Sequence, residues 1–195
     1  MAVPTFVFVP GVFHTPAHAR PLLDALNTAG YRAQAVALAS VGLQADTAPP
    51  NGDVERVRAV LQSLVVEEHE EVVLVCHSYG GVVGSQAVAG LERSKRAAQG
   101  AEGGIIRVVF LAAILPREGE SLVDVLVASD IPVDDWLQPV DETNMVANAK
   151  STHILFHDLE DEAAVRWTNQ LKPMARHALT TPAVGVCWNL DVEKV

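Results

Sequence analysis

The sequence predicts an α/β fold, in which a mostly parallel sheet is flanked by helices. Short β-rich apolar runs alternate with segments of helical periodicity over the first 116 residues. Several of these runs are almost continuously apolar, which is typical of strands that are buried on both faces. With 49% hydrophobic and 19% charged residues among 195 positions, the chain can also form one sizeable core.

The elements of this core are expected in a regular order. Strands are predicted at residues 5–9, 31–38, 72–76 and 105–115, and helices at 17–29, from 53 onward and at 81–98. Pro10 and Gly11 end the first strand, and Gly30 ends the first helix. The expected strand order is second, first, third and fourth. The run IIRVVFLAAIL would then form an exposed sheet edge, through which the chain could form an oligomer.

The pattern changes after Pro116. Residues 117–181 contain short amphipathic helical pieces, at 121–128 and 160–170, separated by proline and acidic turns, with no convincing buried strand. We therefore expect a core at residues 1–116, a helical cap-like segment at 117–181, and a shortened start of the C-terminal part of the core at 182–195.

Charge and composition narrow the function classes. The 14 Lys and Arg against 24 Asp and Glu give a formal net charge of -10, which repels phosphate backbones and anionic lipid surfaces. We expect neither a nucleic-acid nor a membrane partner, and the opening MAVPTFVFVPGVF has no basic region of a signal peptide. Cys76 and Cys187 make no metal-binding spacing, so we expect free thiols, no metal, no cofactor and a cytoplasmic location.

The stretch VVLVCHSYGGVVG, residues 72–84, places Ser78 at the end of a buried strand and at the start of a glycine-rich helix. This arrangement is typical of a nucleophile elbow, whose sharp turn lifts a serine hydroxyl above the sheet. Cys76 stands where the G-x-S-x-G pattern has its first glycine. The helix N-terminus after Ser78 would also stabilise negative charge on a substrate.

With these motifs the chain resembles the α/β-hydrolase superfamily, and within it the branch of plant methylesterases and hydroxynitrile lyases and related fungal and bacterial hydrolases. The resemblance covers residues 3 to about 188, including FVFVPGVFHTPAHARPLLDAL, VVLVCHSYGGVVG and VVFLAAILPREGES. It implies that Ser78 is the nucleophile and that the N–H groups of Val12 and Tyr79 are the oxyanion donors. It also matches His14 to a histidine that is common in the first loop, which we expect to line the substrate pocket or to brace the loop rather than to act as a base. We expect His77 to line the substrate pocket as well.

The resemblance leaves the acid and the base of the triad unassigned. In this fold both follow the serine along the chain, and the sequence ends at TPAVGVCWNLDVEKV, where relatives would begin the strands that carry them, so we expect a truncated chain. His153, His157 and His177 fall in the cap-like segment, without a strand to hold them. The candidate acids are expected to be solvated carboxylates: Glu118, Glu120, Asp124 and Asp191.

The leading hypothesis is a serine hydrolase of the esterase, lactonase or thioesterase type. It would act on a small or medium carboxylic ester through an acyl-enzyme on Ser78, and a chain without the base can be inactive. The alternative, favoured by the unassigned base, is a catalytically dead homologue that works as a binding or interaction protein. Lyase chemistry on the same scaffold stays open. A phosphate-binding G-x-G-x-x-G turn is disfavoured because Tyr79 stands where glycine is needed.

Overall fold

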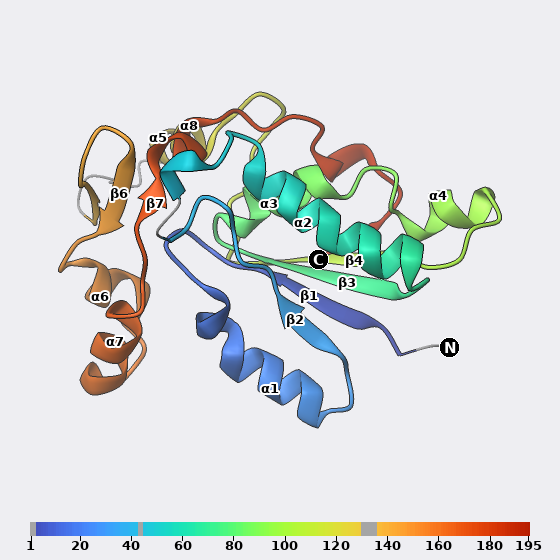
Figure 1. The fold of residues 1–195 in the computed structure, drawn as a ribbon, viewed down its shortest axis with the longest axis horizontal. Coiled ribbons are helices and arrows are strands. Elements are labelled where there is room, and N and C mark those ends of the chain that lie inside the picture. The colour runs from blue at the N-terminus through green and yellow to red at the C-terminus, as the bar shows by residue number, and fades with distance from the viewer. Residues whose placement is uncertain (1–2, 43–44, 130–135) are drawn as a thin grey trace.

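A five-stranded parallel sheet forms the centre of the structure, a computed structural model that describes residues 3–42, 45–129 and 136–195. The strand order is β2-β1-β3-β4-β8, and the predicted order of the first four strands is confirmed. The strands are β1 (Thr5–Val9), β2 (Ala33–Ala35), β3 (Glu71–His77), β4 (Gly104–Leu111) and β8 (Glu193–Lys194). Helices lie on both sides of this sheet, as Figure 1 shows, so the predicted fold class is confirmed.

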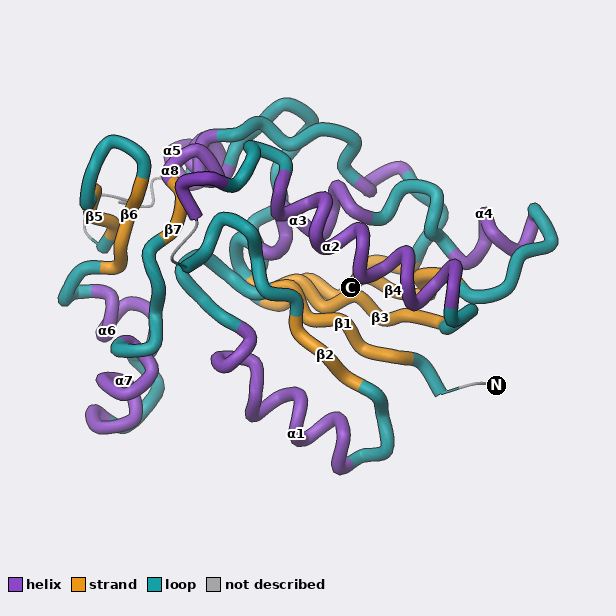
Figure 2. Tube along the Cα trace, in the orientation of Figure 1, coloured by secondary structure: helices purple, strands orange, loops and turns teal. Residues whose placement is uncertain are grey.

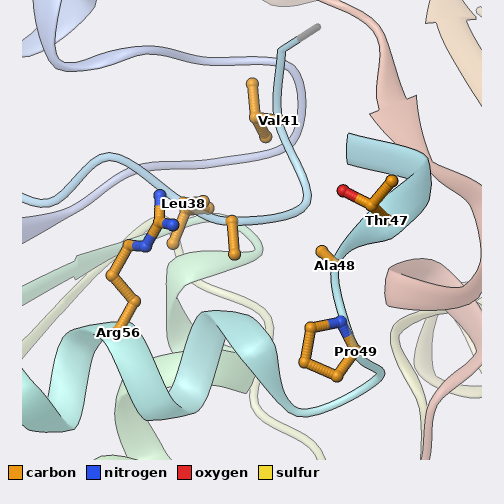
Figure 3. Close-up of a pocket in the computed structure, with 7 residues that line it drawn as sticks. Leu38, Val41, Thr47, Ala48, Pro49 and Arg56 are labelled. Atoms are coloured by element: carbon orange, nitrogen blue, oxygen red, sulfur yellow. The ribbon is translucent and has the colours of Figure 1, made fainter. Parts of the chain in front are cut away.

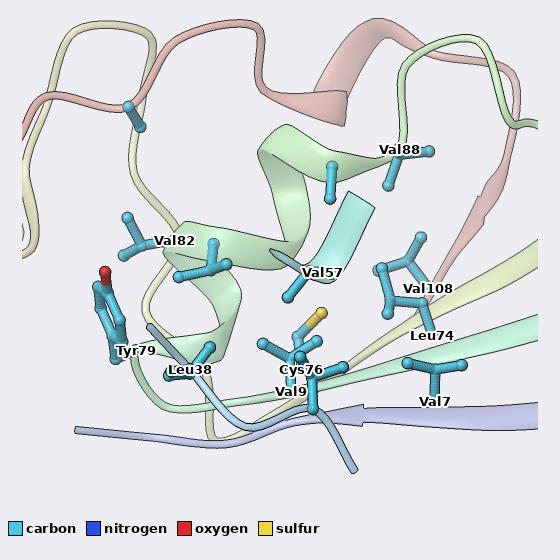
Figure 4. Packing of buried hydrophobic residues seen from close by; sticks show 14 of the residues in the cluster. Val7, Val9, Leu38, Val57, Leu74, Cys76, Tyr79, Val82, Val88 and Val108 are labelled. Atoms are coloured by element: carbon cyan, nitrogen blue, oxygen red, sulfur yellow. The ribbon is translucent and has the colours of Figure 1, made fainter. Parts of the chain in front are cut away.

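The two faces of the sheet carry different helices. The helix α1 (Arg20–Thr28), which follows a 3-10 turn at Pro16–Ala19, lies on one face, and α2 (Gly52–Gln62) and α3 (Gly80–Ala87) lie on the other (Figure 1). The helix α2 continues into a π-helical turn at Ser63–Glu67. Figure 4 shows side chains of α2 and α3 packed over apolar residues of the sheet.

The predicted helix at 81–98 is divided into α3 and α4 (Arg93–Ala98). Gly90 lies between them with a φ of 85°, a left-handed conformation that cannot continue a helix. The predicted strand at 31–38 is reduced to the three residues of β2. In both places the apolar pattern of the sequence continues beyond the residues that form the helix or the strand.

The segment from 117 to 181 is not purely helical, and the expectation of helical pieces without a convincing buried strand is wrong in that strands are present. It contains a three-stranded antiparallel sheet in the order β5-β6-β7. Its elements are α5 (Leu122–Ala128), β5 (Leu137–Pro139), β6 (Asn144–Ala147), α6 (Ser151–Leu155), α7 (Asp161–Thr168), β7 (Met174–Ala175) and α8 (Arg176–Thr180). Strands of two to four residues are too short to leave a periodic signal. Figure 2 places this sheet beside the carboxyl ends of the central strands.

The fourth strand is not the sheet edge that the sequence suggests. The strand β8 pairs with it in parallel, with Arg107 opposite Glu193 and Val108 opposite Lys194. The N–H of Phe110 donates to the carbonyl of Val195 at 2.7 Å, and Arg107 and Glu193 form an ion pair at 2.7 Å. The stretch NLDVEKV was not expected to form a strand because it is polar. It can form one because the outermost strand of a sheet does not need an apolar sequence.

Within the described residues, no helix combines the length and the apolar character needed to cross a bilayer.

Candidate active site

Ser78 occupies a strained turn between β3 and α3. Its φ is +52°, a conformation that non-glycine residues seldom adopt. The carbonyl oxygen of Ser78 accepts hydrogen bonds from the N–H groups of Gly81 and Ile114, both at 2.9 Å. The backbone conformation is therefore held from two directions, by the start of α3 and by the segment after β4. We call residues 77–81 the nucleophile turn.

Glycines let the nucleophile turn approach the neighbouring backbone. A Cβ placed on Gly80 would lie 2.2 Å from the carbonyl oxygen of Val9, at the end of β1. A Cβ on Gly81 would lie 2.4 Å from the carbonyl oxygen of Ile114. Because real Cβ atoms do not come this close to backbone oxygens, side chains are excluded at both positions.

Cys76 fits where the pattern has a glycine because another glycine faces it. A Cβ on Gly84, one turn into α3, would lie 2.2 Å from the sulfur of Cys76. Figure 4 shows this sulfur within the apolar core. Burial raises the pKa of the Cys76 thiol, so it stays protonated and serves as a small apolar group. The partnership with Gly84 was missed in the sequence, although the spacing of eight residues was visible there. Both cysteines are free, as predicted, and both are buried.

The loop after β1 lies against Ser78. A Cβ on Gly11 would be 3.0 Å from Cβ and 3.4 Å from Oγ of Ser78. Val12 follows Gly11, and both Val12 and Tyr79 are buried. In the part of the chain that the structure describes, the backbone N–H of neither residue donates a hydrogen bond. The two turns that carry the expected oxyanion donors therefore meet at Ser78.

His14 and His77 line one cavity of about 350 Å³ beside this loop. The Nδ1 atom of His77 lies 3.4 Å from the point where a Cβ on Gly11 would stand, the same distance as Oγ of Ser78, so the cavity begins close to the serine. The cavity is lined by Phe8, Pro10, His14, His18, Ala19, Pro21, Leu22, His77, Leu111, Leu155, Phe156, Leu159 and Trp167. It is therefore mostly apolar, with imidazoles as its polar groups.

The three histidine rings of this cavity are close to one another. The ring centroid of His14 lies 4.6 Å from that of His18 and 6.0 Å from that of His77. Burial lowers the pKa of His14 to about 4, and burial also lowers the pKa of His18 and His77. Because a carbonyl oxygen can only accept, the Nδ1–H of His14 donates to the carbonyl of Val12 at 2.6 Å. His18 was not singled out in the sequence, although it lies only four residues after His14.

No base for Ser78 is found in residues 3–42, 45–129 and 136–195: there, Oγ of Ser78 forms no hydrogen bond to a histidine or a carboxylate. His153 and His157 line a separate small cavity with residues of α6 and α7. His177 belongs to α8, beside Glu142 and Arg176.

The carboxylates that were expected to be solvated have structural partners in three of four cases. Glu118 accepts from the N–H groups of Gly185 and Val186, and Glu120 accepts from the N–H of Arg117. Asp124 accepts from Ser121 in the capping box of α5, and Asp191 is exposed. In the same described residues no three His, Cys, Asp or Glu side chains converge as metal ligands would.

A larger cavity, of about 550 Å³, has no residue of the nucleophile turn in its lining (Figure 3). It is formed by the connection between β2 and α2, together with Arg56 of α2. Its lining residues are Leu38, Ala39, Val41, Thr47, Ala48, Pro49 and Arg56, none of which was predicted as a site residue. A third cavity, of about 270 Å³, is lined by Tyr79 and Asp53 on the side of α2 and α3. Of the three, the cavity lined by His77 and by the loop after β1 is the one that we take as the substrate cavity, because the same loop lies against Oγ of Ser78.

Residues 6–191 match the sequence model of the alpha/beta hydrolase family. The alpha/beta hydrolase nvfD of Aspergillus novofumigatus is 28% identical over 188 residues, which are 96% of this chain and 74% of that protein. The carbendazim hydrolyzing esterase of Nocardioides sp. is 34% identical over 122 residues, which are 62% of this chain. The chain spans 46% of the length of this esterase.

Several solved structures have the same fold. The tomato Methylketone Synthase I, complexed with 2-tridecanone, superposes with a TM-score of 0.74 at 18% identity, covering all of this chain and 78% of its own. Polyneuridine aldehyde esterase gives a TM-score of 0.70 at 20% identity, covering 94% of this chain and 75% of its own. These likenesses concern the fold.

Proposed function

Because this chain belongs to the alpha/beta hydrolase family, we propose that it carries the nucleophile, Ser78, of a serine hydrolase that cleaves carboxylic esters through an acyl-enzyme. The observation that carries this proposal is the positive φ of Ser78 in a turn where glycines bring α3 and β1 together. A strained conformation of a non-glycine residue is costly and is retained at functional sites. The names of relatives, among them two esterases, support ester chemistry.

In the proposed reaction, Oγ of Ser78 attacks the ester carbonyl carbon and the carbonyl oxygen becomes negatively charged. The N–H groups of Val12 and Tyr79 donate to this oxygen, and the N-terminus of α3 adds a favourable potential. Loss of a single oxyanion donor costs about 10²- to 10³-fold in rate in enzymes of this type. The Ser78 hydroxyl gives its proton to solvent. Collapse of the intermediate breaks the ester C–O bond, the leaving oxygen takes up a proton from water to form the alcohol, and the acyl group stays on Ser78. Attack by water then breaks the bond between the acyl group and Oγ, releases the carboxylic acid and returns a proton to Oγ.

The proposed substrate is a small or medium ester with an apolar portion. The cavity lined by His14 and His77 has a volume of about 350 Å³ and is mostly apolar. The lowered pKa values of these histidines keep both rings neutral at pH 7, so neither offers a positive charge to an anionic group. A neutral acyl or alcohol portion suits this lining better than a charged one.

A second candidate function is ligand binding without turnover. It is favoured by one observation, the lack of a hydrogen-bonded base at Oγ of Ser78 within the described residues. Without a base, the oxyanion donors and binding alone provide about 10³- to 10⁴-fold acceleration over water. The two candidates therefore differ in the reactivity of Ser78 and not in the shape of the site.

A fluorophosphonate probe tests the first candidate against the second. We expect covalent labelling of the purified chain that is lost in Ser78→Ala. The matched control is Ser85→Ala, because Ser85 is a fully buried serine of α3 that donates to the carbonyl of Val82 and not to the site. Labelling that is absent in the parent, or that persists in Ser78→Ala, would contradict the proposed hydrolase, and the first of these outcomes would favour the binding protein.

A further inference from the structure

Asp53, Ser40 and Tyr79 form a buried polar cluster beside the nucleophile turn. Their exposed fractions are 4%, 2% and 4%. Oδ1 of Asp53 accepts from the backbone N–H of Ser40 at 2.8 Å, and Oδ2 accepts from the Ser40 hydroxyl at 2.5 Å and from the Tyr79 hydroxyl at 2.9 Å. Both carboxylate oxygens are thus used, which is the condition under which a protein tolerates a buried acid.

The cluster is well placed to persist at neutral pH. Asp53 is the second residue of α2, an eleven-residue helix, and its carboxylate lies at the positive end of the helix dipole. Burial raises the pKa of the Tyr79 hydroxyl, and the neighbouring Asp53 raises it further. The hydroxyl therefore keeps its proton and remains a donor to the carboxylate.

Three separate segments meet in this cluster. Ser40 belongs to the loop after β2, Asp53 to the start of α2, and Tyr79 is the residue next to Ser78. Figure 4 shows the Tyr79 side chain extended along the core beside Val82, with its hydroxyl at the far end. The ring is thus fixed at two points, by the backbone of the nucleophile turn and by a carboxylate 26 residues earlier in the chain.

We propose that Asp53 is a positioning residue of the active site: by holding the Tyr79 hydroxyl, it fixes the Tyr79 backbone N–H relative to Ser78. This inference rests on the proposed function, in which that N–H donates to the developing oxyanion. A donor aimed in advance stabilises the transition state without reorganising during the reaction. Ser40 in turn orients Asp53, because its backbone N–H and its hydroxyl donate to the two carboxylate oxygens.

The variants separate positioning from mere core stability. Tyr79→Phe removes the hydroxyl and keeps the ring and the N–H, and Asp53→Ala removes the acceptor. Asp53→Asn is the conservative rescue, because an amide can bond to the same three neighbours with its donor and acceptor ends. Ser85→Ala, which also removes a buried hydroxyl from this part of the core, is the control.

The first measurement is the rate of fluorophosphonate labelling of Ser78, at a temperature where circular dichroism shows every variant folded. We expect Tyr79→Phe and Asp53→Ala to label about tenfold more slowly than the parent. The double variant should lose little more, since both substitutions remove the same hydrogen bond between Tyr79 and Asp53. Asp53→Asn should recover most of the rate, and Ser85→Ala should match the parent. Losses that multiply in the double variant, or a Tyr79→Phe rate equal to that of the parent, would overturn the proposal.

The second measurement does not need a reactive serine. Amide hydrogen exchange of the nucleophile turn, followed by NMR or mass spectrometry, should be about tenfold faster in Tyr79→Phe than in the parent and unchanged in Ser85→Ala. Unchanged exchange in Tyr79→Phe would overturn the positioning role even if Ser78 reacts. Faster exchange in a parent background that never labels would support the positioning role and contradict the hydrolase.

Discussion

The two faces of the central sheet differ in how completely they are covered. Along β3, Val72, Leu74 and Cys76 face α2 and α3 and are 0% exposed, whereas Val73 and Val75 face α1 and are 6% and 7% exposed. The better-packed face belongs to a large cluster that includes both helices, and the other belongs to a small cluster under one helix. The nucleophile turn is built on the first face, and the cavity with His77 opens on the second. Rigid packing therefore positions Ser78, while the looser face leaves room for a ligand.

The most severe loss of stability is expected where α3 meets β1. Gly80→Ala would bring a Cβ to 2.2 Å from the carbonyl oxygen of Val9, which as backbone cannot easily move. We expect a loss of more than about 4 kcal/mol in the free energy of unfolding, measured by urea denaturation, or no folded protein.

Gly30→Ala is the control for that variant. Gly30 also lies next to a helix end, but it has open space around it and only a positive φ of 89°. It should cost about 1 kcal/mol. Equal costs at both positions would show that close approach at the nucleophile turn is not what excludes a side chain.

The histidine cavity predicts a pH effect on stability. The folded-state pKa of His14, about 4, lies below its ordinary value of 6.5. As the pH falls from 7, the unfolded chain binds this proton first, so the free energy of unfolding should decrease between pH 6.5 and 4, by up to about 3 kcal/mol. His18 and His77 act in the same direction.

Urea denaturation at pH 7 and pH 5 measures this slope. In His14→Gln the slope should be smaller, and in His157→Gln, which removes an exposed histidine, it should stay close to that of the parent. A slope that is the same in all three proteins would contradict the assigned burial of His14.

The pairing of Cys76 with Gly84 predicts compensation. Gly84→Ala alone should cost about 2–3 kcal/mol because its Cβ meets the Cys76 sulfur. In the background of Cys76→Ala the sulfur is gone and the same change should cost at least about 1 kcal/mol less. Thermal or urea unfolding of the four proteins gives the coupling, and strict additivity would contradict the contact.

A pair of valine substitutions, with smaller expected costs in the free energy of unfolding, compares the two faces directly. Val108 and Val109 are neighbours on β4, but Val108 is fully buried toward α2 and α3, whereas Val109 is half-buried toward α1. Val108→Ala should cost about 2 kcal/mol, and Val109→Ala less than about 1 kcal/mol. Equal costs would mean that the two faces are equally well packed, and a reversed order would mean that the face toward α1 is the better packed one; either result would contradict the comparison.

Much of the fold was readable from the sequence because the central strands are apolar runs with turn residues at their ends. The strand order, the turn at Ser78 and the free thiols follow from such local patterns. The strands β5 to β8 were missed because they are short, and β8 is also polar. Such strands form because they pair with a neighbouring strand, and their own sequence carries little signal. The partnership of Gly84 with Cys76 and the cluster around Asp53 depend on contacts between segments far apart in the chain, which no local pattern contains.

The most direct test of Ser78 as a nucleophile is to trap its acyl-enzyme. The chain is incubated with p-nitrophenyl butyrate, quenched with acid and mapped by tandem mass spectrometry. An activated ester acylates even a weakly activated serine, and slow deacylation would let the adduct accumulate. We expect one butyryl group on the peptide that contains Ser78, absent in Ser78→Ala and present in Ser85→Ala. No adduct in the parent, or an adduct that persists in Ser78→Ala, would contradict this expectation.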